Sequence, residues 1–186
     1  MVAALLPACS SEHGSDEPNV RIGDGRFSVP TAYQSLAAVG FTTTPALLRN
    51  AAVWRRAALA DPTPANLRRL GVAHASVANL DDAIRILEEL SATGDGGAEA
   101  WSDLSAAYLA RAHRADDVSD LFRALNSAGA AVHANASFAP GWFNEAVAQA
   151  ALGLRAQSSN SWQNFLELET NVEWRNEALS RVDQLG

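Results

Sequence analysis

The chain has 186 residues, 48% of them hydrophobic and 7% aromatic, and its formal net charge is −7. This length suits one domain with a sizeable core, and the abundance of alanine favours helices that pack closely against helices. The negative charge, with no dense run of Lys and Arg, argues against a nucleic-acid partner, and a single cysteine excludes an intrachain disulfide.

Residues 1–18 combine a short apolar run with a polar, acidic tether. The run is too short to span a bilayer and lacks the basic start of an export signal. Its end, Leu6 to Cys9, resembles the end of a bacterial lipoprotein signal, in which a small residue precedes the lipidated cysteine. Two interpretations stay open, a disordered terminus or a truncated lipoprotein signal with Cys9 as the lipid acceptor. They imply a cytoplasmic and a cell-envelope location, respectively.

Residues 19–44 are interrupted by glycines and prolines and show little apolar periodicity, so we expect an irregular arm with a short helix at most. The helical part of the domain then occupies residues 45–186. Its first segment, Pro45 to Ala60, predicts a lone amphipathic helix that begins at a proline and caps the stack that follows. Trp54 lies on the apolar side of this helix.

Three segments of the chain resemble one another, and each predicts a pair of antiparallel helices. They lie near residues 64–97, 98–138 and 139–172, and a further amphipathic helix at 173–186 predicts a terminal cap. Small residues recur where the helices of a pair should touch. These are Gly71, Ser105 and Ala146 on the first helices and Ala83, Ala124 and Ser158 on the second.

The spacing of equivalent residues reveals an insertion in the second repeat. First-helix equivalents are 34 and then 41 residues apart, and they are Leu67, Trp101 and Trp142. Second-helix equivalents are 41 and then 34 residues apart, and they are Ala83, Ala124 and Ser158. Seven extra residues therefore lie between Tyr108 and Ala124, and we assign them to a solvated loop at His113 to Asp117.

Several of these residues match a known repeat motif. Leu70-Gly71, Asp81 to Ile84, Trp101 and Tyr108 resemble the tetratricopeptide repeat (TPR) motif, over roughly residues 64–170. The resemblance implies an all-α fold, a right-handed α-solenoid of antiparallel helix pairs with about three repeats and flanking capping helices. His74 and Glu145 depart from the motif, which usually has Tyr and an apolar residue there.

A narrower resemblance concerns large bacterial proteins with a caspase-like CHAT domain. Trp101 to Ala112 and Trp142 to Ala146 resemble the repeats that precede that domain, and Arg21 to Gly25 resembles an Arg-Leu-Ser-Gly-Gly stretch there. The peptidase portion has no counterpart in these residues, so the resemblance implies no proteolysis by this chain. It leaves open an alternative function, a regulatory or sensor region associated with a CHAT-type peptidase.

The TPR resemblance implies a protein-protein interaction module, in which the stacked first helices form a concave groove for a partner peptide or protein segment. The motif places Arg68, Arg69, Val72, Ser102, Asp103, Ala106, Phe143, Asn144 and Val147 in this groove. Such a groove is basic near Arg68 and Arg69 and apolar near Phe143. We therefore expect a partner segment with a carboxylate at one end and a hydrophobic side chain at the other.

The sequence does not indicate an enzyme, a metal site or a cofactor. No histidine lies three or four residues from another histidine; the four are His13, His74, His113 and His133. Gly94 to Gly97 follows a helix, where a phosphate-binding loop would precede one, so it predicts a C-cap and turn. Asp116, Asp117 and Asp120 lack the spacing of a calcium loop and predict a solvated helix start.

Overall fold

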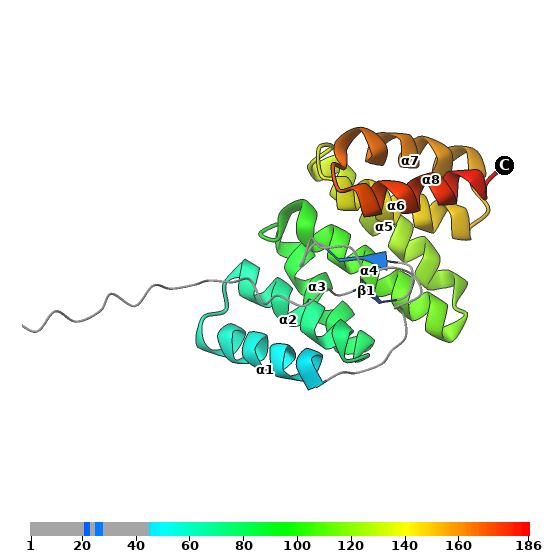
Figure 1. Cartoon of the computed structure of the whole chain (residues 1–186). Helices are drawn as coiled ribbons and strands as arrows, with labels where there is room; N and C mark the ends of the chain where they lie inside the picture. The colour runs from blue at the N-terminus through cyan, green and yellow to red at the C-terminus, as the bar shows by residue number, and fades with distance from the viewer. Residues whose placement is uncertain (1–20, 23–24, 28–44) are drawn as a thin grey trace, which may run out of the picture.

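The computed structural model describes residues 21–22, 25–27 and 45–186, and these form a stack of antiparallel helix pairs (Figure 1). The helices are α1 (Pro45–Ala60), α2 (Pro64–Ser76), α3 (Leu80–Thr93), α4 (Gly97–Ala115), α5 (Val118–Ala134), α6 (Ala139–Ala151), α7 (Arg155–Leu168) and α8 (Val172–Asp183). The pairs α2/α3, α4/α5 and α6/α7 coincide with the three internal repeats. The predicted all-α solenoid is confirmed.

Helix α1 covers the N-terminal end of the stack, where it packs on α2. Proline is well suited to its first position, because the first N–H groups of a helix have no partner within the helix. Trp54 and Ala58 are buried, whereas Val53 and Leu59 remain exposed on the outer side. The helix has the bounds and the buried tryptophan that its amphipathic pattern predicts.

In each helix pair, a small residue lets the two helices approach closely. A Cβ atom at Gly71 would lie 2.7 Å from a leucine side chain of α3, closer than side chains pack. In the second pair, the Ser105 hydroxyl donates to the Ala124 carbonyl over 2.8 Å. In the third pair, the Ser158 hydroxyl donates to the Ala146 carbonyl over 2.8 Å. The last two contacts join positions that the repeat alignment pairs.

The extra residues of the second repeat are helical, so the prediction of a solvated loop is wrong. Helix α4 has 19 residues, where α2 and α6 have 13, and α5 has 17, where α3 and α7 have 14. Asp116 ends α4 in the left-handed region with φ of 52°, and Asp117 begins α5 by accepting a hydrogen bond from the Ser119 N–H. The turn is tight, and the insertion lengthens the helices.

A buried ion pair joins the two lengthened helices. Asp120 of α5 has a side chain only 1% exposed and accepts hydrogen bonds of 2.6 and 2.9 Å from Arg111 of α4. Arg111 also reaches Asp81 of α3 at 2.8 Å, and Arg123 adds a contact of 3.2 Å to Asp120. Asp120 is therefore part of the interior and not of a solvated helix start, contrary to the expectation from sequence.

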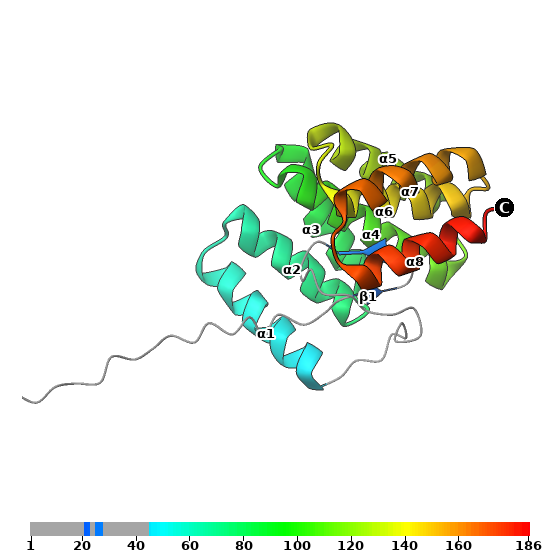
Figure 2. The ribbon, with the colours of Figure 1, turned by 45° about the horizontal axis from the view of Figure 1, so that its top comes forward.

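Two short strands lie on the face formed by the first helices, the concave surface of α2, α4 and α6 (Figures 1 and 2). Strands β1 (Arg21–Ile22) and β2 (Gly25–Arg26) pair antiparallel, with Arg21 opposite Arg26 and Ile22 opposite Gly25. Strand β1 contacts α2 and α4, and β2 contacts α4 and α6. The described part of the segment expected to be an irregular arm thus contains two paired strands.

Candidate functional site

The residues predicted to line a groove all lie on first helices: Arg68, Arg69 and Val72 on α2, Ser102, Asp103 and Ala106 on α4, and Phe143, Asn144 and Val147 on α6. Arg68 and Arg69 keep partial exposure, and the others are buried. Gly25, Arg26 and Phe27 are buried as well, and β2 lies directly on α4 and α6. The chain thus covers part of its own concave surface.

The side-chain amide of Asn144 holds the main chain of Arg26 on this surface. Its Oδ1 accepts from the Arg26 N–H over 2.7 Å, and its Nδ2 donates to the Arg26 carbonyl over 2.8 Å. The same Nδ2 lies 3.0 Å from both the carbonyl and the hydroxyl oxygen of Ser102, which orients the amide. One buried amide therefore satisfies both backbone polar groups of an extended residue, as a neighbouring strand would do.

At position 25 the main chain comes too close to α4 for any side chain. A Cβ atom on Gly25 would lie 2.6 Å from Cα and 2.8 Å from the carbonyl oxygen of Ala106. Both are backbone atoms of a long helix, so this contact cannot relax by a side-chain rotation. The close approach requires glycine.

The Arg26 side chain occupies a pocket built by the end of the solenoid. Its Nη1 lies 2.6 Å from Oε2 of Glu169, and the two side chains are 6% and 10% exposed. The guanidinium carbon is 4.2 Å from the ring centre of Trp174 and 5.6 Å from that of Phe165. An ion pair and a cation–π contact are both stronger where water is excluded, so this pocket is suited to an arginine.

Phe143 packs behind this pocket instead of facing solvent. Its ring meets Trp162 at 5.0 Å and Trp174 at 5.1 Å between centroids, both edge to face. The side chain is fully buried. Phe143 thus supports the tryptophan that contacts Arg26, and it offers no exposed apolar patch of its own.

The end of the surface expected to be basic has mixed charge. Nε of Arg68 lies 3.9 Å from Oδ2 of Asp103, whose side chain is fully buried. Arg68 also borders an open hollow between the starts of α2 and α4, which Asp95 and Glu99 line as well. Carboxylates of the chain therefore already lie near the arginine that the sequence assigned to a partner carboxylate.

Comparison with solved structures identifies the architecture. TTC0263, a thermophilic TPR protein of Thermus thermophilus, matches with a TM-score of 0.64 and 24% identity, over 73% of this chain and 70% of that one. MamA matches with a TM-score of 0.53 and 15% identity, over 73% of this chain and 84% of that one. The fold is the TPR fold. No protein-family model and no curated protein matches the sequence.

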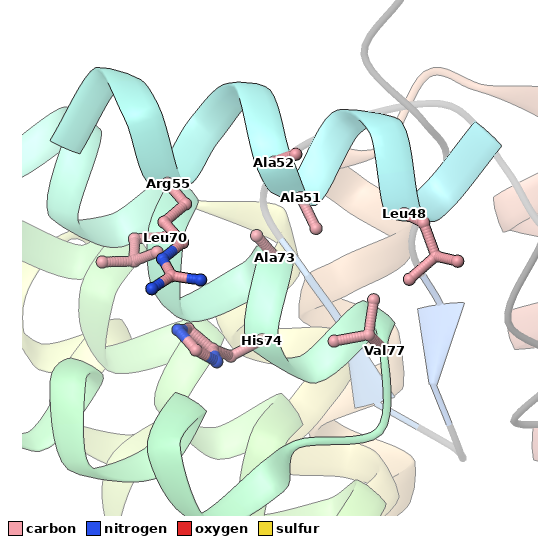
Figure 3. A pocket seen from close by; sticks show the side chains of 8 residues that line it. All are labelled: Leu48, Ala51, Ala52, Arg55, Leu70, Ala73, His74 and Val77. Carbon is pink, nitrogen blue, oxygen red and sulfur yellow. The ribbon is translucent and has the colours of Figure 1, made fainter. Parts of the chain in front are cut away.

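A second hollow of the TPR stack lies between α1 and α2, with a volume of about 220 Å³ (Figure 3). Its walls are mostly apolar, and Arg55 and His74 point toward each other at one end. Burial is the main cause that lowers the pKa of His74; Asp82 opposes the shift, and Arg55 adds to it. The imidazole is therefore mostly neutral at pH 7, as suits a partly buried side chain at the position where the TPR motif usually has Tyr.

The described residues contain no group of three or more His, Cys, Asp or Glu side chains that could hold a metal ion. Within the same part of the chain, no helix has the length and apolar character needed to cross a bilayer. Cys9 and His13 lie outside the described residues. The predicted lipid acceptor therefore stays a prediction.

Four residues of the site were not predicted from the sequence, namely Gly25, Arg26, Glu169 and Trp174. Helical periodicity locates helices, and residues 19–44 show little of it. The sequence pattern therefore could not predict that part of this segment contacts α4 and α6. One signal was available. The resemblance of Arg21 to Gly25 to a stretch in CHAT-domain proteins marked part of this arm as more than a linker.

Proposed function

We propose that this chain is a protein-interaction module whose concave surface holds an extended peptide segment by its main chain. The Asn144 amide supports the proposal most directly, since it offers one acceptor and one donor to a single extended residue. In strand-type peptide recognition, main-chain hydrogen bonds supply affinity and side-chain pockets supply specificity. The chain's own segment illustrates both parts.

The predicted surface residues have different roles in this proposal. Asn144 and Ser102 form the main-chain clamp, and Ala106 sets how closely a ligand backbone approaches α4. Phe143 supports the arginine pocket from behind. The clamp contributes about 0.5–1.5 kcal/mol per hydrogen bond, so loss of Asn144 removes a large part of the affinity of a short segment.

Selection from a displayed library of random peptides tests the proposal with the full chain as bait. Asn144→Leu keeps the side-chain size but removes both hydrogen bonds, and Asn160→Leu, at an exposed position of α7, is the matched control. We expect peptides that bind the wild type and the control but not Asn144→Leu. Peptides that bind all three proteins equally, with melting curves showing Asn144→Leu folded, would place the interaction on another face.

A second proposal is a regulatory or sensor role for a CHAT-type peptidase carried by another chain. Two of the three stretches that resemble CHAT-domain proteins lie close together: Trp101 to Ala112 belongs to α4, and the described residues of Arg21 to Gly25 belong to the strands that contact α4. The resemblance thus concerns one packed unit. A peptidase of this type from the same genome should change its cleavage rate when the chain is added, and an unchanged rate would dismiss this role.

Lipid anchoring through Cys9 is proposed separately, because it concerns location and not the binding surface. If Cys9 is the lipid acceptor, the wild-type protein should partition into the membrane fraction of its host and Cys9→Ser should not. Equal partitioning of the two proteins would dismiss the anchor.

A further inference from the structure

The concave surface already has an occupant with a definite sequence, Gly25-Arg26-Phe27. Arg26 is 5% and Phe27 1% exposed, and Arg26 lies 118 positions from the asparagine that clamps it. None of these residues belongs to a helix of the repeats, and residues 28–44 separate them from α1. The segment therefore sits on the solenoid as a tethered ligand, and its contacts indicate which ligands the surface accepts.

The first position of such a ligand must be glycine and the second arginine. Glycine is required because a Cβ atom would overlap the backbone of Ala106. Arginine fits the second position because a planar guanidinium can pair with Glu169 and also lie over Trp174, which the compact ammonium of lysine does less well. A carboxylate at this position would face Glu169 inside a pocket that excludes water.

The third position is apolar and large. The Phe27 side chain is 1% exposed and belongs to the hydrophobic core cluster that also contains Val72, Leu104 and Phe143 of the first helices. Burial of a phenylalanine side chain contributes about 1.5–3 kcal/mol, comparable to the two hydrogen bonds of the clamp together. The surface thus distinguishes an extended Gly-Arg-Phe segment from most others.

We infer that the partner presents an extended Gly-Arg-Phe segment, and that Gly25–Phe27 competes with it for the same surface. The inference rests on the proposed function and adds the ligand class. Competition follows because Asn144 can clamp one main chain at a time. A ligand joined to its own site by a short stretch of chain has an effective concentration on the order of 1 mM, so the resting protein binds the partner weakly.

The test uses a synthetic, fluorescently labelled peptide of residues 19–29 and the full-length protein. Gly25→Ala in the protein prevents its own segment from docking but leaves every residue of α4, α6 and α8 unchanged. Gly129→Ala is the matched control, because a Cβ atom there meets only Glu145, at 3.8 Å. By fluorescence anisotropy, Gly25→Ala should bind the peptide about tenfold or more tightly than the wild type and the control. Equal affinities, or no binding by Gly25→Ala, would overturn the inference.

A second variant covers the case in which Gly25→Ala does not fold. Arg26→Glu in the protein sets two carboxylates against each other and should also open the surface to the peptide. A separate protein with Glu169→Arg, which keeps Arg26, makes the test specific: its own arginine is repelled from the pocket, so a peptide carrying Glu in place of Arg should bind this protein better than the original peptide does. If both peptides bind this protein equally, the Arg26 pocket does not select the ligand and the inference is wrong.

The outcome also separates this inference from the proposed function. If library peptides depend on Asn144 but the peptide of residues 19–29 binds no variant, the surface binds extended segments of another pattern. The inference then fails and the proposed function stands. If library peptides bind independently of Asn144 and the 19–29 peptide does not bind, both the inference and the proposed function fail.

Discussion

Gly71 shows how one residue controls the closure of a helix pair. A Cβ atom there would lie 2.7 Å from a leucine side chain of the facing helix, in a part of the core that is fully buried. Gly71→Leu should lower the free energy of unfolding by about 1–3 kcal/mol, because overpacking forces side chains or backbone to shift. Thermal melting monitored by circular dichroism measures this.

The control for this prediction is Gly129→Ala on α5, where a Cβ atom makes only an ordinary contact. Alanine is the better helix former, so this variant should melt at the wild-type temperature or above it. If Gly71→Leu also kept the wild-type melting temperature, the helices would not close at Gly71.

Glu145 stands where the TPR motif has an apolar residue. Its burial raises its pKa, while a hydrogen bond of 3.0 Å from the Ser161 hydroxyl acts in the opposite direction. The folded protein therefore holds this proton more tightly than the unfolded chain, and the contribution of Glu145 to stability falls as pH rises above the unfolded value of 4.5.

From this follows a prediction for Glu145→Gln, which removes the charge and keeps a hydrogen-bonding side chain of the same size. The variant should melt above the wild type at pH 7, and the difference should shrink toward pH 4. Melting curves across this range measure it, with Glu167→Gln, an exposed position on α7, as the control. Identical pH dependence of the two variants would contradict the prediction.

Residue types identified the helix faces well and the exposure of those faces poorly. The spacing of Phe143 and Asn144 places both on the first helix of the third repeat, where the structure has them. Their burial could not be predicted in the same way, because Asn144 bonds Arg26, more than 100 positions away, and Phe143 packs on Trp162 and Trp174 of later helices. A motif gives the direction of a side chain within its repeat, but not what covers it.

At the scale of elements, the Arg111–Asp120 pair ties α4 to α5, and the bond from Arg111 to Asp81 adds α3. Arg111→Ala leaves a buried carboxylate with only the longer contact from Arg123, so we expect a loss of about 3 kcal/mol in unfolding free energy. Urea denaturation measures it.

Arg85→Ala is the matched control, since Arg85 pairs with Asp82 and Glu89 on the exposed face of α3. Water and salt screen exposed pairs, so this variant should stay close to the wild type in unfolding free energy. Equal losses in the two variants would mean that the buried pair does not hold the lengthened helices together.

The sequence predicted the elements closely where local patterns determine them. Pro45 begins α1 as expected, and the Gly94 C-cap ends α3 in the left-handed region with φ of 77°. The insertion was placed correctly but assigned to a loop. The extra residues lie at the end of α4 and at the start of α5, so the apolar spacing within the rest of each helix is the same as if they formed a loop. The pattern therefore could not distinguish the two cases.

At the scale of the whole molecule, the decisive feature is the return of Gly25–Phe27 to the solenoid. Contacts between distant segments follow from shape and chemistry, such as the Asn144 amide and the Glu169–Trp174 pocket, and no periodicity encodes them. The cost of closing a long loop grows only slowly with its length, so the distance along the chain is no obstacle. Under our proposal, a partner segment would compete with Gly25–Phe27 for this surface.

Hydrogen exchange at the backbone amide of Arg26, followed by NMR on the full-length protein, tests this occupancy most directly. The amide donates to Asn144 and is buried, so it should exchange far more slowly than in the free peptide of residues 19–29. Asn144→Leu should restore fast exchange at Arg26, while the amides of α4 stay protected. Exchange of the Arg26 amide at the free-peptide rate in the wild type, with α4 protected, would show that Gly25–Phe27 does not occupy the concave surface.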